Sequence, residues 1–444
     1  MDWLTGLGVV AFALGLLASI ALHELGHLVP AKRFGIKVSQ YMVGFGRTVW
    51  SRRRGETEYG LKAIPLGGYV RMVGMFPPEP GEDPRRLRTA STGPLQALID
   101  DARRASREEI RPGEEDRLFY RKPWWKKLIV MLAGPAMNVL IAAVLAASVL
   151  MTYGNPAEPV LRPVVSEVSA CVVPVADGNR PCTAEDPPTP AAAAGIRPGD
   201  RLVSFDGEPI DSWSEAQELI RSQAAGPVEV VVVRDGRQLT LVADLITTQR
   251  RALGEPAENG IRQPTDELVT VGFLGVSPTQ QLVPEDLGGA VGWIGEFTVL
   301  TAEAVVSIPQ KMVGVWEAAF GGAERDLTGP IGIVGAGRIG GEIATADIDV
   351  ADRVATFVLL LASFNMAIAL FNLLPLLPLD GGHAVGALWE GVKRGYARLT
   401  GGPQPRPVDV AKALPLAYAV AVVLIGMSAL LLYADIVNPV RLSG

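Results

Sequence analysis

Residues 3–28 read WLTGLGVVAFALGLLASIALHELGHL, twenty uncharged residues that lead directly into a His-Glu-x-x-His pattern. About 20 apolar residues are enough for a helix to cross the hydrocarbon layer of a membrane. Asp2 is the only charge before the run, and the basic start and small-residue cleavage site of a secretory signal peptide are missing. We therefore expect residues 1–28 to form a retained first transmembrane helix.

The histidines at the end of this helix predict a metal site. His23 and His27 are spaced so that one helix face presents both imidazoles, which suits a zinc ion bound at about 2 Å from a nitrogen of each ring. Glu24 is placed to act as general base without binding the metal. Two interfacial histidines are the alternative, since a short pattern also arises by chance. Ionisable residues that continue an apolar membrane helix are costly, which favours the metal site.

A catalytic zinc ion usually has three protein ligands, so a third is expected at the same depth on another span. Residues 372–383 read NLLPLLPLDGGH and contain the only other histidine. Asp380 is charged amid apolar sequence and precedes two glycines that let the backbone turn, so it is the expected third ligand. His383 is the fallback, and its alternative role is that of a hydrogen-bonding residue just past the span. The two prolines interrupt helix geometry and free backbone groups, which suits a segment that holds an extended substrate.

Three further apolar runs are long enough to span a membrane, and 48% of the residues are hydrophobic. We place these transmembrane helices at residues 128–153, 354–383 and 413–433. The prediction is a polytopic α-helical membrane protein with about four transmembrane helices, a membrane-associated β-hairpin and an inserted α+β domain.

The connecting segments carry opposite charges. Residues 29–127 contain 21 Lys and Arg, whereas residues 154–350 contain 13 Lys and Arg against 28 Asp and Glu. The short loop at 384–412 is also basic. By the positive-inside rule the two basic segments are cytoplasmic, the acidic segment and both termini are outside, and the zinc site lies toward the cytoplasmic side. The net charge of −6 gives no support to nucleic-acid binding.

The cytoplasmic segment contains one region with a strand signal. Residues 59–72 combine strand-forming residues with a Gly-Gly pair and predict a β-hairpin or small sheet. Residues 76–101 predict a loose loop, and residues 103–121 a charged surface helix.

The outer segment divides into three parts. Residues 154–190 are Pro-rich and predict an irregular linker. Residues 191–245 predict a compact module, with a helix and two strands around Asp235-Gly236. Residues 246–350 predict an exposed linker and then an amphipathic helix at 290–320 that lies on the outer membrane surface.

The only cysteines, Cys171 and Cys182, both fall in the Pro-rich linker. A disulfide is the expected state in an oxidising compartment. Two unpaired thiols in a variable loop are the alternative.

The sequence closely resembles the site-2 protease family of intramembrane zinc metalloproteases, in its bacterial branch with an extracytoplasmic PDZ domain, the regulator of sigma-factor proteolysis type. The matching pieces follow the order of that family and span nearly the whole chain: His23-Glu-Leu-Gly-His27, Pro65-Leu-Gly-Gly-Tyr69, Ala133-Gly-Pro-Ala-Met-Asn138, Leu327-Thr-Gly-Pro-Ile-Gly332 and residues 372–383. The two metal motifs together are highly specific, whereas the Gly-Pro and Gly-Gly pieces are weak alone.

The resemblance implies the roles of particular residues. Zinc (Zn²⁺) would be bound by His23, His27 and Asp380, with Glu24 as the catalytic base. An unwound substrate would be held by Gly67, Gly68, Asn138 and Asn372. For Asn138 a helix–helix contact is an equal alternative. The implied activity is cleavage of single-pass membrane proteins such as anti-sigma factors, or of remnant signal peptides, in regulated intramembrane proteolysis at the bacterial plasma (inner) membrane.

The resemblance also implies that residues 191–245 are a PDZ domain, with residues 195–207 near its ligand groove. Such a groove binds a peptide tail as an added strand. A domain that only excludes bulky substrates is the alternative.

A function of another class is a non-catalytic PDZ receptor or scaffold in the lipid bilayer with a structural zinc site. A zinc transporter is a weaker alternative. Glu24 separates these from a protease, because a structural zinc site needs no base.

Overall fold

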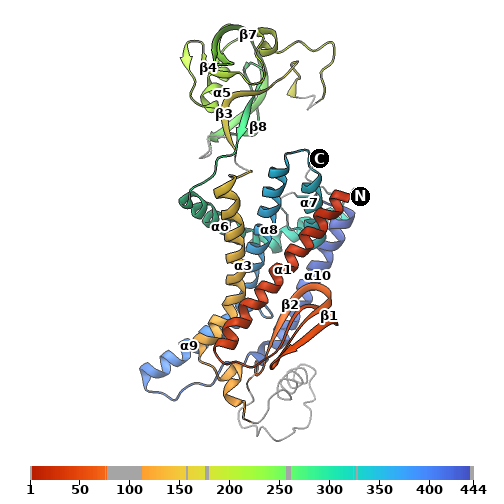
Figure 1. Ribbon diagram of the computed structural model, residues 1–444, viewed down its shortest axis with the longest axis vertical. Helices are drawn as coiled ribbons and strands as arrows, with labels where there is room; N and C mark the ends of the chain where they lie inside the picture. The colour runs from red at the N-terminus through yellow and green to blue at the C-terminus, as the bar shows by residue number, and fades with distance from the viewer. Residues whose placement is uncertain are drawn as a thin grey trace. The chain divides into compact units, whose positions relative to one another are not determined.

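The computed structural model describes residues 3–75, 77, 113–156, 159–175, 180–256, 262–323, 325–326 and 329–440. The predicted loop at 76–101 and the first part of the predicted helix at 103–121 lie almost wholly outside these residues. The chain forms two compact units, a helical unit of residues 1–149 and 287–444 and a sheet-rich unit of residues 150–286. Figure 1 labels their elements.

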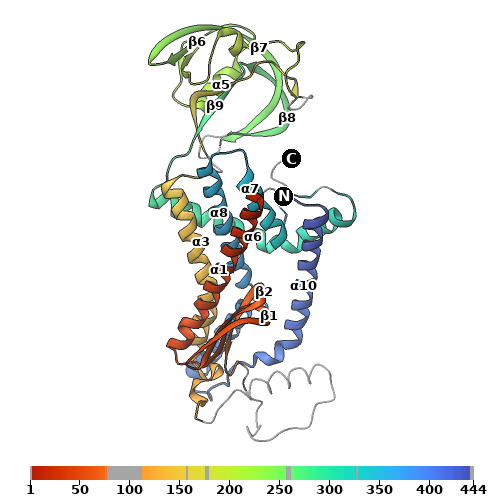
Figure 2. The same cartoon turned by 45° about the vertical axis from the view of Figure 1, so that its right-hand side comes forward.

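Five of the described helices are long and apolar enough to cross a membrane: α1 (Trp3–Arg33), α3 (Trp124–Thr152), α6 (Leu287–Phe320), α8 (Val350–Asn372) and α10 (Leu414–Val437). These helices confirm a polytopic membrane protein. α1 begins and α10 ends at the same end of the helical unit (Figure 2).

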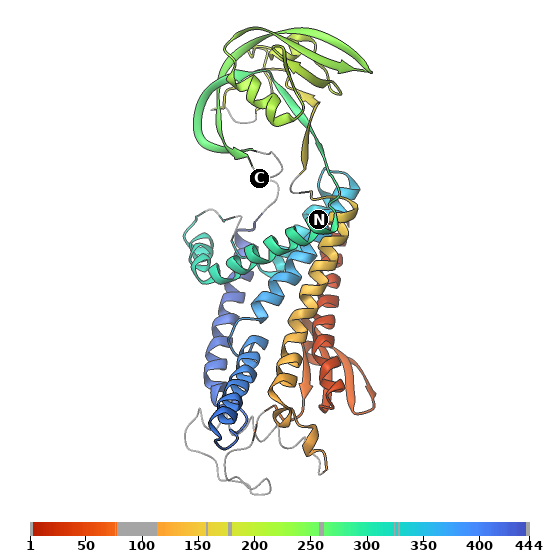
Figure 3. The ribbon, with the colours of Figure 1, turned by 90° about the vertical axis from the view of Figure 1, so that its left-hand side faces the viewer.

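α6 is the helix that the sequence analysis did not count as a span. Its length and composition would let it cross a membrane. Figure 3 shows that α6 runs across the other helices of the unit rather than alongside them. With α6 included, the described residues contain five candidate spans, one more than the four that the sequence predicts.

The predicted third span is wrong in its second half. α8 ends at Asn372, residues 373–379 are irregular, and a separate helix, α9, covers Asp380–Thr400. Pro375 and Pro378 explain the break, since proline lacks the N–H that a continuing helix needs. The segment predicted as a loop at 384–412 is therefore mostly helical.

Glycines let α1 approach two other helices closely. A β-carbon on Gly8 would come within 2.5 Å of the Gly340 carbonyl oxygen in α7 (Ile333–Thr345). A β-carbon on Gly26 would come within 2.5 Å of the Ala133 carbonyl oxygen in α3. Small residues at helix contacts permit such close backbone approach in membranes. α1 is thus fixed near both of its ends.

Strands β1 (Val38–Arg54) and β2 (Thr57–Met72) form an antiparallel sheet beside α1. Both strands bend, and Gly44 and Gly67 have the positive φ values, 91° and 82°, that such bends require. Tyr41 lies opposite both Tyr59 and Val70, so the first half of β1 is flanked on either side by the two halves of β2.

This arrangement corrects the predicted hairpin at 59–72. Those residues belong to one strand whose two halves pair with β1 and not with each other. The hairpin turn is at Gly55, which has a φ of 64°, and not at the Gly-Gly pair. The second half of β2 forms an outer edge of the sheet.

The helical unit also contains short 3₁₀ helices. η1 (Glu115–Arg117) and η2 (Phe119–Arg121) follow the sheet in the chain, and η4 (Val410–Ala413) precedes α10.

The sheet-rich unit contains seven strands in the order β8-β7-β6-β4-β3-β9, with β5 paired to β4. They are β3 (Val160–Val168), β4 (Arg201–Phe205), β5 (Glu208–Pro209), β6 (Gly226–Arg234), β7 (Arg237–Pro256), β8 (Arg262–Phe273) and β9 (Val276–Gln281). Two helices, α4 (Pro190–Ala194) and α5 (Trp213–Ser222), pack on it around a core that includes Phe205, Trp213, Val230, Leu245 and Leu274.

Several predictions for this unit can be compared directly. β6 and β7 form the hairpin predicted at Asp235-Gly236, and both turn residues have positive φ, as a tight hairpin turn requires. Cys171 and Cys182 are joined in the expected disulfide. The linkers are wrong in part, because β3 lies in residues 154–190 and β7 and β8 continue through much of residues 246–273. β7 and β8 pair with each other, whereas β3 pairs with β4 and β9.

Candidate metal centre

α1 supplies three of the residues at the candidate centre. His23, Glu24 and His27 are 8%, 8% and 5% exposed, so all three are buried although they are ionisable. Buried ionisable groups in a membrane helix need a partner or a function. The two imidazoles lie close together, with 3.2 Å between their Nε2 atoms.

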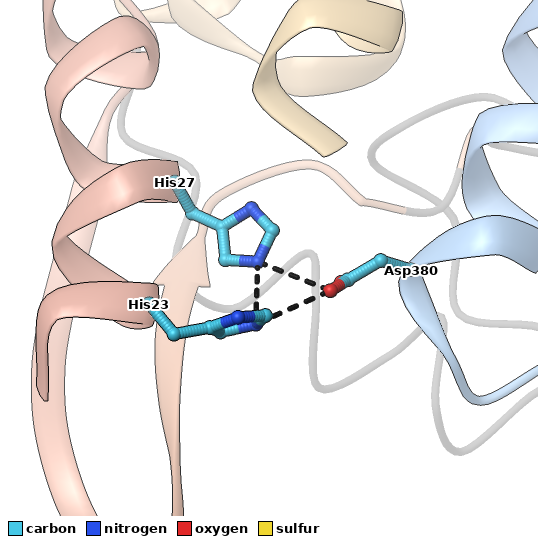
Figure 4. A group of neighbouring side chains, drawn as sticks. All are labelled: His23, His27 and Asp380. Carbon is cyan, nitrogen blue, oxygen red and sulfur yellow. Dashed lines mark hydrogen bonds and ion pairs between the residues drawn. The ribbon is translucent and has the colours of Figure 1, made fainter. Parts of the chain in front are cut away.

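The third member comes from a distant part of the sequence. Asp380 is the first residue of α9, and its Oδ2 lies 3.3 Å from Nε2 of His23 and 3.3 Å from Nε2 of His27. Figure 4 shows the two histidines of α1 and the aspartate of α9 pointing at one another. Among the residues that the structure describes, these three form the only group with the donor atoms and spacing of a metal site.

The spacing of the three donor atoms fits zinc. Zinc bonds of about 2.0–2.1 Å in a tetrahedral arrangement separate neighbouring ligand atoms by about 3.3 Å. The observed separations are 3.2, 3.3 and 3.3 Å. Two imidazole nitrogens and one carboxylate oxygen are also the donor set of a catalytic zinc site, which keeps its fourth position open.

The other nitrogen of each imidazole is already engaged. His23 Nδ1 lies 3.1 Å from Oδ1 of Asn138, and His27 Nδ1 lies 2.7 Å from the Val130 carbonyl oxygen. With the proton on Nδ1, each ring donates to its oxygen and leaves Nε2 free as a ligand. Such hydrogen bonds fix both the ring orientation and the tautomer of metal-binding histidines.

The start of α9 packs closely against the irregular segment that precedes it. A β-carbon on Gly381 would come within 2.2 Å of the Leu374 carbonyl oxygen, and one on Gly382 within 2.7 Å of the Leu377 nitrogen. The two glycines were expected to let the backbone turn. They are helical instead, and their lack of a side chain lets the start of α9 lie against residues 373–377.

All of the residues predicted for the site line one cavity of about 480 Å³. These residues are His23, Glu24, His27, Gly67, Gly68, Asn138, Asn372 and Asp380. His383, the fallback ligand, lines the same cavity but is not part of the three-residue group. The rest of the lining is largely apolar and includes Ile20, Met72, Met131 and Ile368.

Strand β2 lies directly against the candidate base. A β-carbon on Gly68 would come within 2.8 Å of Glu24 Cγ and 2.9 Å of the Met42 carbonyl oxygen. Only a glycine therefore allows the backbone of this strand to pass so close to Glu24. The outer half of β2, including Tyr69 and Val70, forms one wall of the cavity.

Two groups that contact the histidines could not be identified from the sequence. The first is the carbonyl of Val130, which no side-chain pattern reveals. The second is Gly134, which packs on the His27 ring. Its signal was the Gly-Pro motif at 133–138, but that motif alone did not say what the glycine contacts.

Comparison with known proteins identifies the family to which the chain belongs. Residues 11–400 match the sequence profile of Peptidase family M50. Zinc metalloprotease Rip1 of Mycobacterium tuberculosis (strain ATCC 25618 / H37Rv) is 38% identical over 438 residues, which cover 98% of each chain. Rip1 of Mycolicibacterium smegmatis is 34% identical over 449 residues, 98% of this chain and 99% of that protein. Metalloprotease MmpA of Caulobacter vibrioides is 30% identical over 402 residues, 84% of each chain.

Proposed function

The chain belongs to peptidase family M50 and is an intramembrane zinc metalloprotease, and from this premise we propose which residues perform the hydrolysis. His23, His27 and Asp380 hold the zinc ion, and Glu24 is the general base. The observation that carries the assignment is the convergence of three donor atoms, 3.2–3.3 Å apart, in the cavity that Glu24 also lines.

Zinc, when bound, polarises the scissile carbonyl and makes water acidic enough to be deprotonated near neutral pH. Glu24 accepts a proton from this water as the water oxygen forms a bond to the carbonyl carbon. Glu24 then gives this proton to the peptide nitrogen as the carbon–nitrogen bond breaks. The carboxylate is restored at the end of each turnover.

The substrate segment must be extended to reach this centre. A transmembrane helix hides its carbonyls in backbone hydrogen bonds, and unwinding leaves those groups without partners in lipid. We propose that residues 67–72 of β2 pair with the unwound segment as a neighbouring strand. Support comes from the register, in which Val70 pairs with Tyr41 on one side, and from the position of this edge in the cavity wall.

Two asparagines complete this proposal. Asn372 ends α8 at the break before residues 373–379 and lines the cavity, where its amide can bind a backbone group of the substrate. Asn138 uses Oδ1 to orient His23. Its buried Nδ2 has no hydrogen-bond partner among the described residues, so it can donate to a substrate carbonyl.

We also propose a class of substrate and an orientation of the chain in the membrane. We propose single-pass membrane proteins, such as anti-sigma factors or remnant signal peptides, because a single unwound segment would suffice to fill the cavity that α1, β2 and the residues around the α8–α9 break line. The basic residues of 29–127 and 384–412 support a centre toward the cytoplasmic side of the bacterial plasma membrane. They also support an extracytoplasmic position for the sheet-rich unit, residues 191–245 of which we propose as a PDZ domain.

Glu24→Gln tests the catalytic assignment. The variant should keep its zinc, measured by elemental analysis of the purified protein, because Glu24 is not one of the ligands. Cells that carry it should accumulate intact single-pass membrane proteins that wild-type cells cleave, as measured by quantitative membrane proteomics. Glu303→Gln, an exposed carboxylate on α6, is the matched control. Equal substrate levels in Glu24→Gln and wild-type cells would refute the role of Glu24.

The third ligand has its own test. Asp380→Ala should lose both zinc and cleavage, whereas His383→Ala should keep its zinc. If Asp380→Ala keeps its zinc and His383→Ala loses it, the ligand assignment moves to His383. A receptor with structural zinc would also lose zinc in Asp380→Ala, but it would show no change with Glu24→Gln.

A further inference from the structure

The β1–β2 sheet has a second edge, on the side away from the candidate metal centre. Residues 48–54 of β1, here called the β1 edge, pair with residues 57–62 of β2 and with no other described residues. The opposite edge, residues 68–72, is the one in the wall of the metal-centre cavity. All seven residues of the β1 edge are exposed. The proposed hydrolysis uses the edge at 68–72 and leaves the β1 edge without a role.

The turn that ends the β1 edge lies near the end of α1. Glu56, next to the turn at Gly55, accepts bonds of 2.7 and 2.6 Å from the Arg117 guanidinium. The Arg117 carbonyl accepts a 3.0 Å bond from the amide of Lys37, which follows the end of α1 at Arg33 by four residues. The last turn of α1 and the arginines before Gly55 are therefore at the same end of the helical unit, as Figure 2 shows for the sheet and α1.

Three basic side chains gather at this end of the sheet. Arg52 and Arg54 are two residues apart on a strand, so they lie on the same face of the sheet. Arg52 lies opposite Tyr59 in the register, and the Tyr59 hydroxyl accepts a 2.7 Å bond from Lys32 of α1. The Lys32 ammonium also lies 5.2 Å from the centre of the Tyr59 ring. Two distant parts of the chain therefore bring three positive charges to one face.

The two carboxylates that follow the turn do not neutralise these charges. The Glu56 carboxylate is bound by Arg117, at 2.6 Å. The Glu58 side chain lies opposite Arg53, which points to the other face of the strand. Within the described part of the chain, neither of the other two arginines of the β1 edge forms an ion pair with a carboxylate. This face therefore carries uncompensated positive charge, which favours an anion.

Apolar side chains continue from the arginines toward the other end of the sheet. Trp50 lies on the same face as Arg52 and opposite Leu61, and both apolar side chains are exposed. Farther along, Phe45 lies opposite Ile64, and both are again exposed. Tryptophan is typical of the boundary between lipid and water, with apolar residues deeper in the membrane and Lys or Arg beyond it. The order along the strand pair is thus that of a surface that enters a lipid layer.

We propose that the β1 edge binds anionic phospholipids, with Arg52 and Arg54 at the headgroup phosphate and with Trp50 and Leu61 against the start of the acyl chains. The occupant is a lipid and not a soluble anion, because the basic side chains are continuous with apolar ones on the same strand pair. The leaflet is the one at the end of α1 that carries Arg33, which is the cytoplasmic leaflet in the proposed orientation. The site is independent of the residues assigned to hydrolysis.

The test uses the purified full chain in nanodiscs of phosphatidylcholine. One sample contains a small fraction of phosphatidylglycerol with a photoreactive diazirine at the start of an acyl chain, and a parallel sample contains phosphatidylcholine with the same diazirine. After irradiation, mass spectrometry of the digested protein measures the lipid attached to residues 45–61. We expect the anionic probe to label this segment at least about fivefold more than the zwitterionic one, since each basic residue beside a membrane strengthens binding of anionic lipid by about that factor. Inorganic phosphate at 10 mM should leave the ratio unchanged.

Variants assign this preference to the two arginines. Arg52→Gln combined with Arg54→Gln should bring the ratio close to one. Arg398→Gln combined with Arg406→Gln removes the same charge from two other exposed arginines and should keep the wild-type ratio. Changing Arg52 and Arg54 to Lys should keep most of the preference, which separates loss of charge from distortion of the strand.

Three outcomes would overturn the proposal. They are a ratio near one in the wild-type chain, an equal fall in the two double Gln variants, and loss of the preference when inorganic phosphate is added, which would mean that the site binds a soluble anion. Because labelling needs no cleavage, each of these outcomes is separate from failure of the Glu24 assignment.

Discussion

Gly134 of α3 lies so close to His27 of α1 that a β-carbon added to it would come within 2.2 Å of Nε2, the atom that faces Asp380. The neighbouring contact is also close, since a β-carbon on Gly26 of α1 would come within 2.5 Å of the Ala133 carbonyl oxygen. The Gly-Pro motif at 133–138 therefore shapes the metal centre through backbone contact. It places α3 where the Val130 carbonyl and the Asn138 amide reach the two imidazoles.

Gly134→Ala should remove zinc and activity together, because the new methyl group would occupy the position of the His27 ring and displace it. Zinc content by elemental analysis and cleavage of a membrane substrate are the measurements. Gly314→Ala is the matched control, since a β-carbon on this helical glycine of α6 meets nothing within 4 Å. A Gly134→Ala protein with full zinc content would show that His27 is not a ligand in the observed orientation.

Asn138→Leu should weaken zinc binding by roughly 10- to 100-fold, the usual effect of removing a hydrogen bond to a metal-binding histidine. The measurement is zinc affinity, by competition with a chelator. Asn365→Leu serves as the control, because Asn365 of α8 is a buried amide that donates to Ser19 of α1, the helix that carries both histidines, and not to a histidine itself. If both variants bind zinc equally well, Asn138 has only the packing role.

Gly68→Ala should separate metal binding from catalysis. The three atoms nearest the added β-carbon would be Glu24 Cγ at 2.8 Å, the Met42 carbonyl oxygen at 2.9 Å and Glu24 Oε1 at 3.2 Å, and none of them belongs to a metal ligand. A displacement of the base by about 1 Å costs on the order of 100-fold in rate. We expect kcat to fall by that order while zinc content is unchanged; a loss of zinc in this variant would mean that β2 supports the metal site itself.

Much of this centre could be predicted because its signals are local. His23 and His27 lie on one helix turn, and Asp380 stands out as a charge in apolar sequence. The break after Asn372 was harder, since an apolar run has the same composition whether it continues as a helix or not. The two prolines indicate an interruption of the helix, whereas the apolar composition favours a single span, which is predicted through residue 383.

Contacts between distant segments were the part that sequence could not supply. The Gly67-Gly68 pair predicts a turn by its composition, but pairing with β1 and contact with Glu24 decide its conformation. The family resemblance implies a ligand groove near residues 195–207, whereas α5 and residues 272–276 line a cavity of about 150 Å³. Residues 272–276 reach α5 only through the order of the strands in the folded sheet.

Lys127 and Glu390 form a buried ion pair between α3 and α9, with 2.7 Å between Nζ and Oε2 and with side chains 6% and 1% exposed. Lys127→Met would remove one of two ion-pair partners of the buried Glu390 carboxylate, which keeps Arg394 at 2.7 Å. We expect a cost of at most about 3–5 kcal/mol, the range for a buried carboxylate that loses its partner. Because α9 begins with Asp380, we expect a lower thermal midpoint and weaker zinc binding. Adding Glu390→Leu should recover part of both losses, and Arg398→Met, which changes an exposed residue of α9, is the control. A double variant no better than the single one would contradict a role for the buried Glu390 charge in either loss.

Asp200 and Arg234 make the stability of the sheet-rich unit dependent on pH. Asp200 accepts two bonds of 2.7 Å from the guanidinium and one of 2.8 Å from the Arg197 amide. Burial opposes ionisation, but these bonds hold the pKa of Asp200 below its usual value. The stabilisation is therefore complete above the unfolded-state pKa of about 3.9 and is lost as the pH falls through the lower folded-state pKa.

Asp200→Asn should reduce the free energy of opening by about 2 kcal/mol at pH 7 and by less toward pH 3. Hydrogen exchange of β4 and β6 in the full chain measures this difference, with Asp235→Asn as the exposed control. An effect of Asp200→Asn that stays constant from pH 7 to pH 3 would show that the carboxylate charge contributes nothing.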